Sequence, residues 1–375
     1  MTVTQPVATG LTAPPAIPAE KAALPSRRDR SGVGIAVLKR IALVPPMLLA
    51  ITTFVFLAMR LMPGSPASSL ATNGTQGLTS AEIEANTALI NEQLGLDRPL
   101  WQQYVDFLRS FVTFDLGSSY YGGNDVANLL WTALPATLEL AVAAMFLAVL
   151  IGVAGGIVAA LTKDTWIDTG IRALSTLTFA LPWFALGVAS IYLFGVVLGW
   201  LPVLGRMPSS LDYTPTTNFV LLDAILQNRP DLVMPWIEHL VLPATTLAIS
   251  MAGFFTRMAR TAVLDVRGED FIRTARMKGA SESRIVFRHL LPNASLPIVT
   301  ALGIQFGSLI GGAVITESVF SYPGIGNLLV SSVIQRDYLV VQGAVLAIAT
   351  VFILVNLVVD LIQIAIDPRL RKGMS

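Results

Sequence analysis

Six long apolar runs recur along the chain, and they constrain its fold more than any other feature. Each has about 20 residues, enough for an α-helix to cross a hydrocarbon core about 30 Å thick. The runs lie at about residues 41–59, 138–161, 174–200, 240–255, 298–315 and 340–364. Charged residues are only 13% of the chain, which is low for a soluble domain. The sequence therefore predicts an all-α, polytopic membrane protein with six transmembrane helices.

Basic residues are distributed unevenly between the segments that connect these runs. Lys and Arg are concentrated before the first run, between the fourth and fifth runs, and after the last run. Residues 60–137 hold three basic and seven acidic residues, and the segment after the third run is also net acidic. Because basic segments remain on the cytoplasmic side of a membrane, we expect both termini and residues 257–297 to be cytoplasmic.

This topology divides the chain into five parts. We expect a disordered cytoplasmic tail over residues 1–32, since this segment is rich in Pro, Ala and Thr; a docking tail is the alternative. A first transmembrane helix over 33–60 leads into an extracytoplasmic helical loop over 61–137, with amphipathic helices at 82–93 and 98–111. A core of five transmembrane helices covers 138–366 and contains the cytoplasmic loop 257–297. Residues 367–375 form the cytoplasmic C-terminus.

Several kinds of chemistry find no support in the sequence. The interiors of the six runs contain no Asp, Glu, Lys, Arg or His, which argues against a proton-driven carrier. There is no phosphate-binding loop of the GxxxxGK[ST] type. With no Cys and two His far apart, we expect no metal site and no cofactor. We expect membrane lipid around the helices and no nucleic acid. Any uphill transport must then draw its energy from a partner.

Small residues lie at four-residue spacing in two of the runs. They are Gly152 and Gly156 in the second, and three of the four glycines Gly303, Gly307, Gly311 and Gly312 in the fifth, where Gly312 directly follows Gly311. This spacing allows helices to approach closely. Two interpretations stay open: packing within one subunit, or contact with another subunit.

The basic cytoplasmic loop has the pattern of a short helix, a break and a second helix. Asp270 can cap the first helix, and Gly279 stands where a glycine would end it. Ser281 can cap the next helix, and Pro292 precedes the return to the membrane. We expect a partner outside the membrane to bind this element and to move the helices on either side of it.

The same loop resembles a known motif. In membrane subunits of ABC importers, the cytoplasmic loop carries E-A-A, three residues, G, nine residues, and I-x-L-P. Here Arg273-Thr274-Ala275 stands at E-A-A, Gly279 matches G, His289 stands at I, and Leu291-Pro292 matches L-P. The segment as a whole resembles the oligopeptide/dipeptide/nickel importer permeases.

Further segments resemble that branch. They include Arg60-Leu61-Met62-Pro63-Gly64-Ser65-Pro66, where Asp is usual at position 65, and Asp115-Leu116-Gly117-Ser118-Ser119, where Phe114 replaces a usual Gly. Val319-Phe320-Ser321-Tyr322-Pro323-Gly324-Ile325-Gly326 and Asp337-Tyr338-Leu339-Val340-Val341-Gln342-Gly343 also match. The long first outer loop resembles that of the B-type subunit.

The resemblance implies a type I ABC importer permease fold in the bacterial inner membrane, without an ATPase site of its own. It implies a second homologous permease, two cytoplasmic ATP-binding subunits and an extracytoplasmic substrate-binding protein as partners. Peptides are the expected substrate, with nickel chelate, glutathione or haem as alternatives. An ion-coupled carrier or channel, or a membrane scaffold, remains as a different class.

The resemblance also assigns roles to residues. The expected ATPase-coupling residues are Phe271, Ile272, Arg273, Thr274, Ala275, Arg276, Lys278, Gly279, Leu291 and Pro292. We expect an outer turn formed by Glu317, Tyr322, Pro323, Gly324 and Gly326. The more specific hypothesis is that this turn acts as a gate.

Overall fold

The structure, a computed structural model, describes residues 30–61, 64–72 and 79–366. The predicted C-terminal segment 367–375 and nearly all of the predicted tail 1–32 lie outside this part. The described residues form helices and no strand. In chain order the α-helices are α1 Arg30–Leu61, α2 Pro66–Thr72, α3 Ser80–Gln93, α4 Leu100–Thr113, α5 Val126–Leu161, α6 Trp166–Ala180, α7 Trp183–Ser190, α8 Val220–Leu226, α9 Val233–Arg267, α10 Asp270–Met277, α11 Glu282–Ile285, α12 Leu291–Val319, α13 Ile325–Gln335 and α14 Tyr338–Ile366. π-Helical segments follow α7 at Ile191–Val197 and α11 at Val286–Leu290, and a 3₁₀ turn, Pro230–Leu232, precedes α9.

Five apolar helical stretches among the described residues are long enough to cross a membrane. They are Ile41–Leu61, Val126–Leu161, Pro230–Arg267, Pro297–Val319 and Tyr338–Gln363. The run at 174–200 differs, because it is divided between two helical pieces, Trp166–Ala180 and Trp183–Val197, that meet at an angle of 99°. The break falls at Leu181-Pro182, where proline cannot donate its backbone hydrogen bond. With this bent pair taken as one span, the predicted total of six is confirmed.

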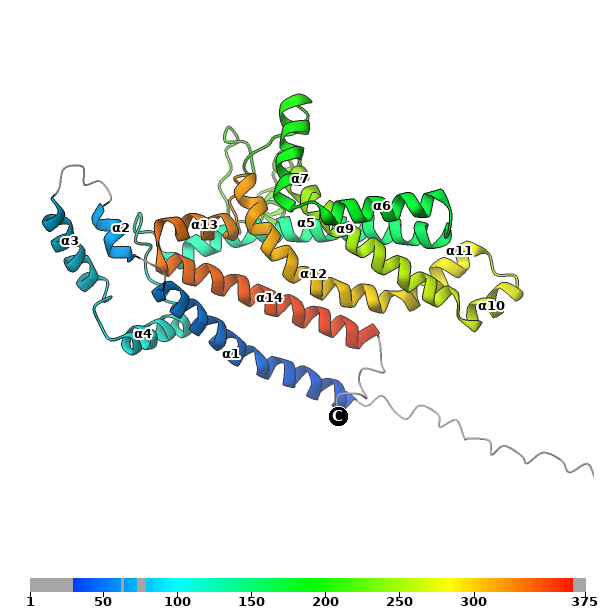
Figure 1. Ribbon diagram of the computed structural model, residues 1–375, viewed down its shortest axis with the longest axis horizontal. Helices are drawn as coiled ribbons and strands as arrows, with labels where there is room; N and C mark the ends of the chain where they lie inside the picture. The colour runs from blue at the N-terminus through cyan, green and yellow to red at the C-terminus, as the bar shows by residue number, and fades with distance from the viewer. Residues whose placement is uncertain (1–29, 62–63, 73–78, 367–375) are drawn as a thin grey trace, which may run out of the picture.

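The two ends of the helix bundle differ in their elements and in their charge. Figure 1 shows α10, α11, the start of α1 and the end of α14 toward one end, and α2, α3, α4 and α13 toward the other. The first end carries the basic cytoplasmic loop, and the second carries the acidic first outer loop. This arrangement agrees with the orientation expected from the basic residues.

Helices α5 and α9 form the closely packed centre of the bundle. A Cβ atom at Gly152 would lie 2.5 Å from the Cβ of Phe255, and one at Gly156 would lie 2.6 Å from the Cβ of Ala259. On α12, Gly303 and Gly307 lie against side chains of α14, and Gly312 lies against the ring of Trp183. These five glycines therefore provide packing within the subunit. Gly311 has open space beside it.

The first outer loop contains two helices close to the expected positions. Helix α4 packs against the outer end of α1, where Phe56 contacts the rings of Tyr104 and Phe107 at 5.3 and 5.9 Å between centroids. The Tyr104 hydroxyl also shares a 2.7 Å hydrogen bond with Thr53. Helix α3 starts with a capping box made by Thr79 and Glu82. Helix α5 begins at Val126, within the segment 61–137 that we expect to form the outer loop.

Candidate functional site

The cytoplasmic loop forms a short helix that ends at a glycine. The C-cap is Lys278, and Gly279 follows in the left-handed conformation with φ of 78°. The N–H of Gly279 donates to the carbonyl of Arg276 at 2.9 Å, and the N–H of Ala280 donates to that of Ala275 at 3.2 Å. These two bonds make a Schellman motif, which satisfies the last carbonyls of the helix and fixes the direction of the turn.

The start of this helix differs from the expectation. Asp270 is its first residue and not its cap, and Glu269, which holds the cap position, makes no side-chain capping bond. The Asp270 carboxylate lies 3.5 Å from Arg273, one turn on, where its negative charge suits the N-terminal end of the helix.

One face of α10 packs against the rest of the protein. Ile272 is fully buried in a cluster that contains residues of α5, α9, α11 and α12. Its members are Ala160, Ala262, Val263, Ile272, Ile285, Val286, Leu290 and Ala294. Ile272 is one of the expected ATPase-coupling residues, and the structure places its side chain in the joint between α10 and the transmembrane helices, not on the exposed face.

The opposite face of α10 is open. Phe271 and Met277 are 43% and 81% exposed, and Arg273, Thr274 and Lys278 are exposed as well. Ala275 and Arg276 are half-buried. Exposed aromatic and methionine side chains beside basic groups are common at protein interfaces.

Arg276 is already paired within the chain. Its guanidinium donates to both carboxylate oxygens of Glu282, at 2.9 and 3.3 Å, across the turn at Gly279. The hydrogen bond from Arg276 lowers the pKa of Glu282. Arg276, one of the expected ATPase-coupling residues, thus makes a bracing contact between α10 and α11.

Leu291 and Pro292 lie where α11 continues into α12. The π-helical segment Val286–Leu290 joins the two, and Pro292 stands in the first turn of α12. Pro292 has no N–H to donate to the preceding turn, and such interruptions in helical bonding accompany π-turns. Leu291 packs against the buried cluster around Ile272. The predicted coupling residues thus occupy one continuous structural unit.

Two further contacts, which the sequence did not suggest, hold this end of the bundle together. Arg267, the last residue of α9, donates to the carbonyl of Ala160 in α5 at 2.9 Å. Arg260 of α9 donates to both oxygens of Asp168 in α6. Both arginines contributed to the basic count of the loop, and only the tertiary structure reveals their partners.

The predicted outer turn also assembles. Glu317 is fully buried near the end of α12, and its carboxylate accepts from the Thr137 hydroxyl at 2.7 Å and from the N–H of Asn327 at 3.0 Å. Thr137 in turn accepts from the N–H of Ile325 at 2.8 Å. A Cβ at Gly324 would lie 2.4 Å from the Glu317 carboxyl, so only glycine allows this approach. Tyr322 is fully buried beside Pro323 in the same turn.

A cavity of about 600 Å³ lies at the break between α6 and α7. Its wall includes Leu181 and Pro182 at the break, Ser250 on α9, and Gln305 and Ser308 on α12. Ser250 and Gln305 are largely buried, so polar groups lie inside an otherwise apolar region. The described residues contain no group of three His, Cys, Asp or Glu side chains that could hold a metal ion.

A model of one protein family matches residues 152–372, which hold the cavity, the cytoplasmic loop and the outer turn. This family is the binding-protein-dependent transport system inner membrane component. The chain belongs to that family. Members are membrane components of ABC transporters, and the chain is accordingly a multi-pass protein of the inner membrane.

Curated relatives match across nearly their whole length. The di/tripeptide transport system permease protein DppB of Pseudomonas aeruginosa is 39% identical over 335 residues, which is 89% of this chain and 98% of that protein. The dipeptide transport system permease proteins DppB of Escherichia coli K12 and of Alkalihalophilus pseudofirmus are 38% and 35% identical over the same shares. The resemblance to ABC peptide-importer permeases is thereby confirmed.

Proposed function

We propose that this chain is one of two permease subunits in an ATP-driven importer of short peptides. The single observation that carries the proposal is α10, a short helix with one buried face and one exposed face, ended by the turn at Gly279. The peptide substrate is supported by the names of the relatives, which are dipeptide and di/tripeptide permeases. The partners are a second homologous permease, two cytoplasmic ATP-binding subunits and an extracytoplasmic substrate-binding protein.

The exposed face of α10 is the contact to one ATP-binding subunit. Phe271 and Met277 enter an apolar groove of that subunit, and Arg273 and Lys278 pair with acidic groups at its rim. Since Arg276 is bound to Glu282, it stiffens the turn and contributes less to docking. Displacement of α10 then passes through Ile272 to α5, α9 and α12, which meet in the same buried cluster.

The cavity at the break of α6 and α7 is a segment of the peptide path. Its buried amide and hydroxyl groups can bind the polar peptide backbone, and its apolar wall accepts varied side chains. Movement of α10 on ATP binding shifts the permease pair between inward- and outward-facing states, as in other two-state transitions.

The outer turn acts as a gate in this cycle. The turn runs from the end of α12 to the start of α13 and contains Glu317, Tyr322, Pro323, Gly324 and Gly326. Thr137 joins it to α5. Thr137→Val removes both hydrogen bonds, and we expect ATP hydrolysis that no longer depends on the binding protein. Thr137→Ser keeps the hydroxyl and serves as its control.

The first test is purification of the tagged chain from native membranes in mild detergent, followed by identification of what accompanies it. We expect a second permease and two ATP-binding subunits, and we expect Gly279→Pro to lose the ATP-binding subunits. A chain that purifies alone, even after cross-linking, contradicts the proposal. The co-purified binding protein is then titrated with dipeptides, a nickel chelate, glutathione and haem, which separates the peptide substrate from the alternatives.

Uptake measurements separate the remaining classes. Peptide uptake that stops on ATP depletion supports the importer. Uptake that continues without ATP while a proton gradient persists identifies an ion-coupled carrier, and deletion that disturbs complex assembly without changing uptake identifies a scaffold.

A further inference from the structure

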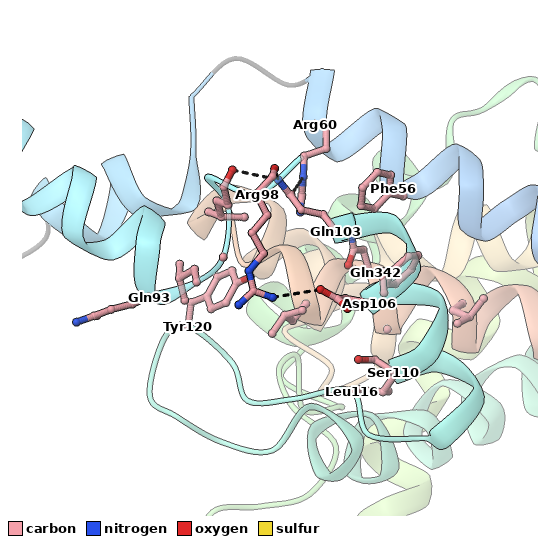
Figure 2. Close-up of a pocket in the computed structure, with 17 residues that line it drawn as sticks. Phe56, Arg60, Gln93, Arg98, Gln103, Asp106, Ser110, Leu116, Tyr120 and Gln342 are labelled. Carbon is pink, nitrogen blue, oxygen red and sulfur yellow. Dashed lines mark hydrogen bonds and ion pairs between the residues drawn. The ribbon is translucent and has the colours of Figure 1, made fainter. Parts of the chain in front are cut away.

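A second cavity, of about 210 Å³, lies on the outer side between α1, α4 and α14. Figure 2 shows Arg60 of α1 above it, Gln103 and Asp106 of α4 along one wall, and Gln342 of α14 beyond them. Arg98, from the segment between α3 and α4, also lines the cavity. It is separate from the cavity at the α6–α7 break and from the cytoplasmic loop.

Arg60 has a buried donor that no described residue satisfies. Its Nε donates to the amide oxygen of Gln103 at 2.8 Å, while its Nη1 is buried and has no hydrogen-bond partner. Burial of an unpaired donor of a charged group is costly, and such groups in folded proteins usually have a partner.

The neighbours of Arg60 do not supply that partner. The amide oxygen of Gln103 accepts from Nε of Arg60 and not from Nη1, and its orientation is fixed because the amide nitrogen donates to the carbonyls of Leu96 and Arg98 at 3.0 and 2.7 Å. The rings of Phe56 and Tyr338 lie 4.9 and 5.2 Å from the guanidinium carbon and provide cation–π contact only. In the described part of the chain, Arg60 forms no ion pair.

The charge of the cavity wall favours an anion. Two arginines and a single acidic residue line it. That acidic residue, Asp106, lies 3.3 Å from Arg98 in a pair whose side chains are about 60% exposed, so it is neutralised at the rim. Deeper in the cavity, the groups that line it beside Arg60 are neutral: the amide of Gln342, which is 4% exposed, and the phenol of Tyr120. The buried carboxylate of Asp337 lies behind Tyr120 and does not line the cavity; it is already bonded within the chain, because it accepts from the Tyr120 N–H at 3.0 Å and from the Ser119 hydroxyl.

We propose that this cavity binds a small carboxylate, with one carboxylate oxygen accepting from Nη1 of Arg60. Hydrogen bonds between a guanidinium and a carboxylate are short and about twice as strong as neutral ones. The Gln342 amide and the Tyr120 hydroxyl can donate to the second oxygen. A cavity of about 210 Å³ holds an acid of a few carbon atoms and is smaller than the usual ligand pocket.

The carboxylate can be a free acid or the side chain of a glutamate in another protein, and the test distinguishes the two. The full-length chain in nanodiscs is titrated with ¹³C-acetate at constant ionic strength, and binding is followed by saturation-transfer NMR. Acetamide, a neutral molecule of the same shape, is titrated in parallel. N-acetyl-glutamate N-methylamide, which carries its carboxylate on a peptide backbone, represents the protein-borne source.

We expect saturable acetate binding, no acetamide binding, and affinity reduced about tenfold or more in Arg60→Gln. Gln342→Leu, which keeps the charge and removes an amide, weakens binding to a smaller extent and also serves if Arg60→Gln folds poorly. Arg109→Gln is the matched control, because Arg109 is an exposed arginine of α4 outside the cavity.

Acetate binding without binding of the blocked glutamate identifies a free acid as the ligand. Binding of the blocked glutamate supports a protein-borne carboxylate. Absence of saturable binding for both probes, or equal binding by Arg60→Gln and the native chain, overturns the proposal.

Discussion

Arg260 of α9 and Asp168 of α6 form a bidentate ion pair inside the helix bundle. The Nε–Oδ1 and Nη2–Oδ2 distances are both 2.8 Å, and the Asp168 side chain has no exposed surface. Asp168 also accepts from the N–H of Asp164 at 3.2 Å, so its oxygens are well satisfied. The pair fixes α6, which leads to the cavity, to α9, which leads to α10.

Loss of this pair is expected to weaken the cytoplasmic end of the bundle. Asp168→Asn leaves Arg260 largely buried without its counterion, and removal of one member of a buried pair costs roughly 3 kcal/mol. Thermal unfolding of the purified chain in detergent measures the loss. Arg172→Gln is the control, because the Arg172 guanidinium is half-exposed and 3.4 Å from the same carboxylate. A melting temperature for Asp168→Asn equal to that of Arg172→Gln would contradict the structural role of the pair.

Substitutions at Gly279 separate backbone conformation from side-chain contact. A Cβ at this position meets no atom within 4 Å, so any cost comes from the left-handed backbone alone. We expect Gly279→Ala to cost about 1 kcal/mol, and Gly279→Asn to cost less, because asparagine tolerates this conformation. Gly279→Pro removes the N–H that bonds to Arg276 and cannot adopt a φ of 78°.

The measurement for this series is retention of the ATP-binding subunits together with peptide uptake. The order should be native, Asn, Ala and then Pro, with little or no uptake for Pro. Ala275→Asp, which alters the half-buried side of α10, is expected to reduce uptake as well. Full uptake in Gly279→Pro would refute a coupling role for the turn.

Two adjacent glycines of α12, Gly311 and Gly312, allow a matched test of the packing of α12 against α7, the helix that follows the break in the third span. A Cβ at Gly312 would lie 2.2 Å from the Trp183 ring, whereas one at Gly311 meets nothing within 4 Å. We therefore expect Gly312→Val to displace α7 from α12, to destabilise the protein by about 1–3 kcal/mol and to reduce uptake. Gly311→Val should leave both thermal stability and folding in detergent close to native. The hypothesis fails if the two variants behave alike.

The outer loop before α9 should be sensitive to acid. Asp223 is fully buried and accepts from the Tyr213 hydroxyl at 2.7 Å and from the N–H and hydroxyl of Thr217 at 2.8 and 2.7 Å. Burial by itself would raise the pKa of Asp223, but the hydrogen bonds from Tyr213 and Thr217 outweigh burial and hold it below its ordinary value of 3.8.

A depressed carboxyl pKa stabilises the folded state fully above the unfolded value and loses that contribution as the pH falls through the folded value. Melting temperatures should therefore fall below pH 3.8 more steeply for the native chain than for Asp223→Asn. At neutral pH the variant should be less stable, because its amide cannot accept all these bonds. Parallel pH profiles for the two proteins would show that Asp223 does not contribute to the acid response.

Hydropathy and basic-residue distribution sufficed for the class of fold and for its orientation. Lipid offers no hydrogen-bond partner to backbone N–H and C=O groups. A continuous apolar run of about 20 residues therefore crosses the membrane as an α-helix, in which these groups bond to one another. The motif around Gly279 likewise predicted a helix, its glycine-terminated end and the following helix. The break at Pro182 had a local signal in the proline itself, although the apolar run continued through it.

Contacts between distant segments could not be predicted from the sequence. In the sequence, Ile272 is one apolar residue on a short predicted helix. Only the position of α5, α9 and α12 shows that its side chain faces inward. Arg276, Arg260 and Arg60 are indistinguishable as basic residues near membrane ends. In the structure the first braces a turn, the second holds a buried carboxylate, and the third lines a cavity with an unpaired donor.

The sequence by itself determined that this protein crosses the membrane, which end is cytoplasmic, and where the basic cytoplasmic loop lies, because these properties depend on local composition and on the transfer of side chains into lipid. The tertiary structure decided which faces are buried, which charges are paired and where cavities remain. Those properties depend on distances between helices that are far apart in the chain, and a buried group changes its role according to the partner it meets.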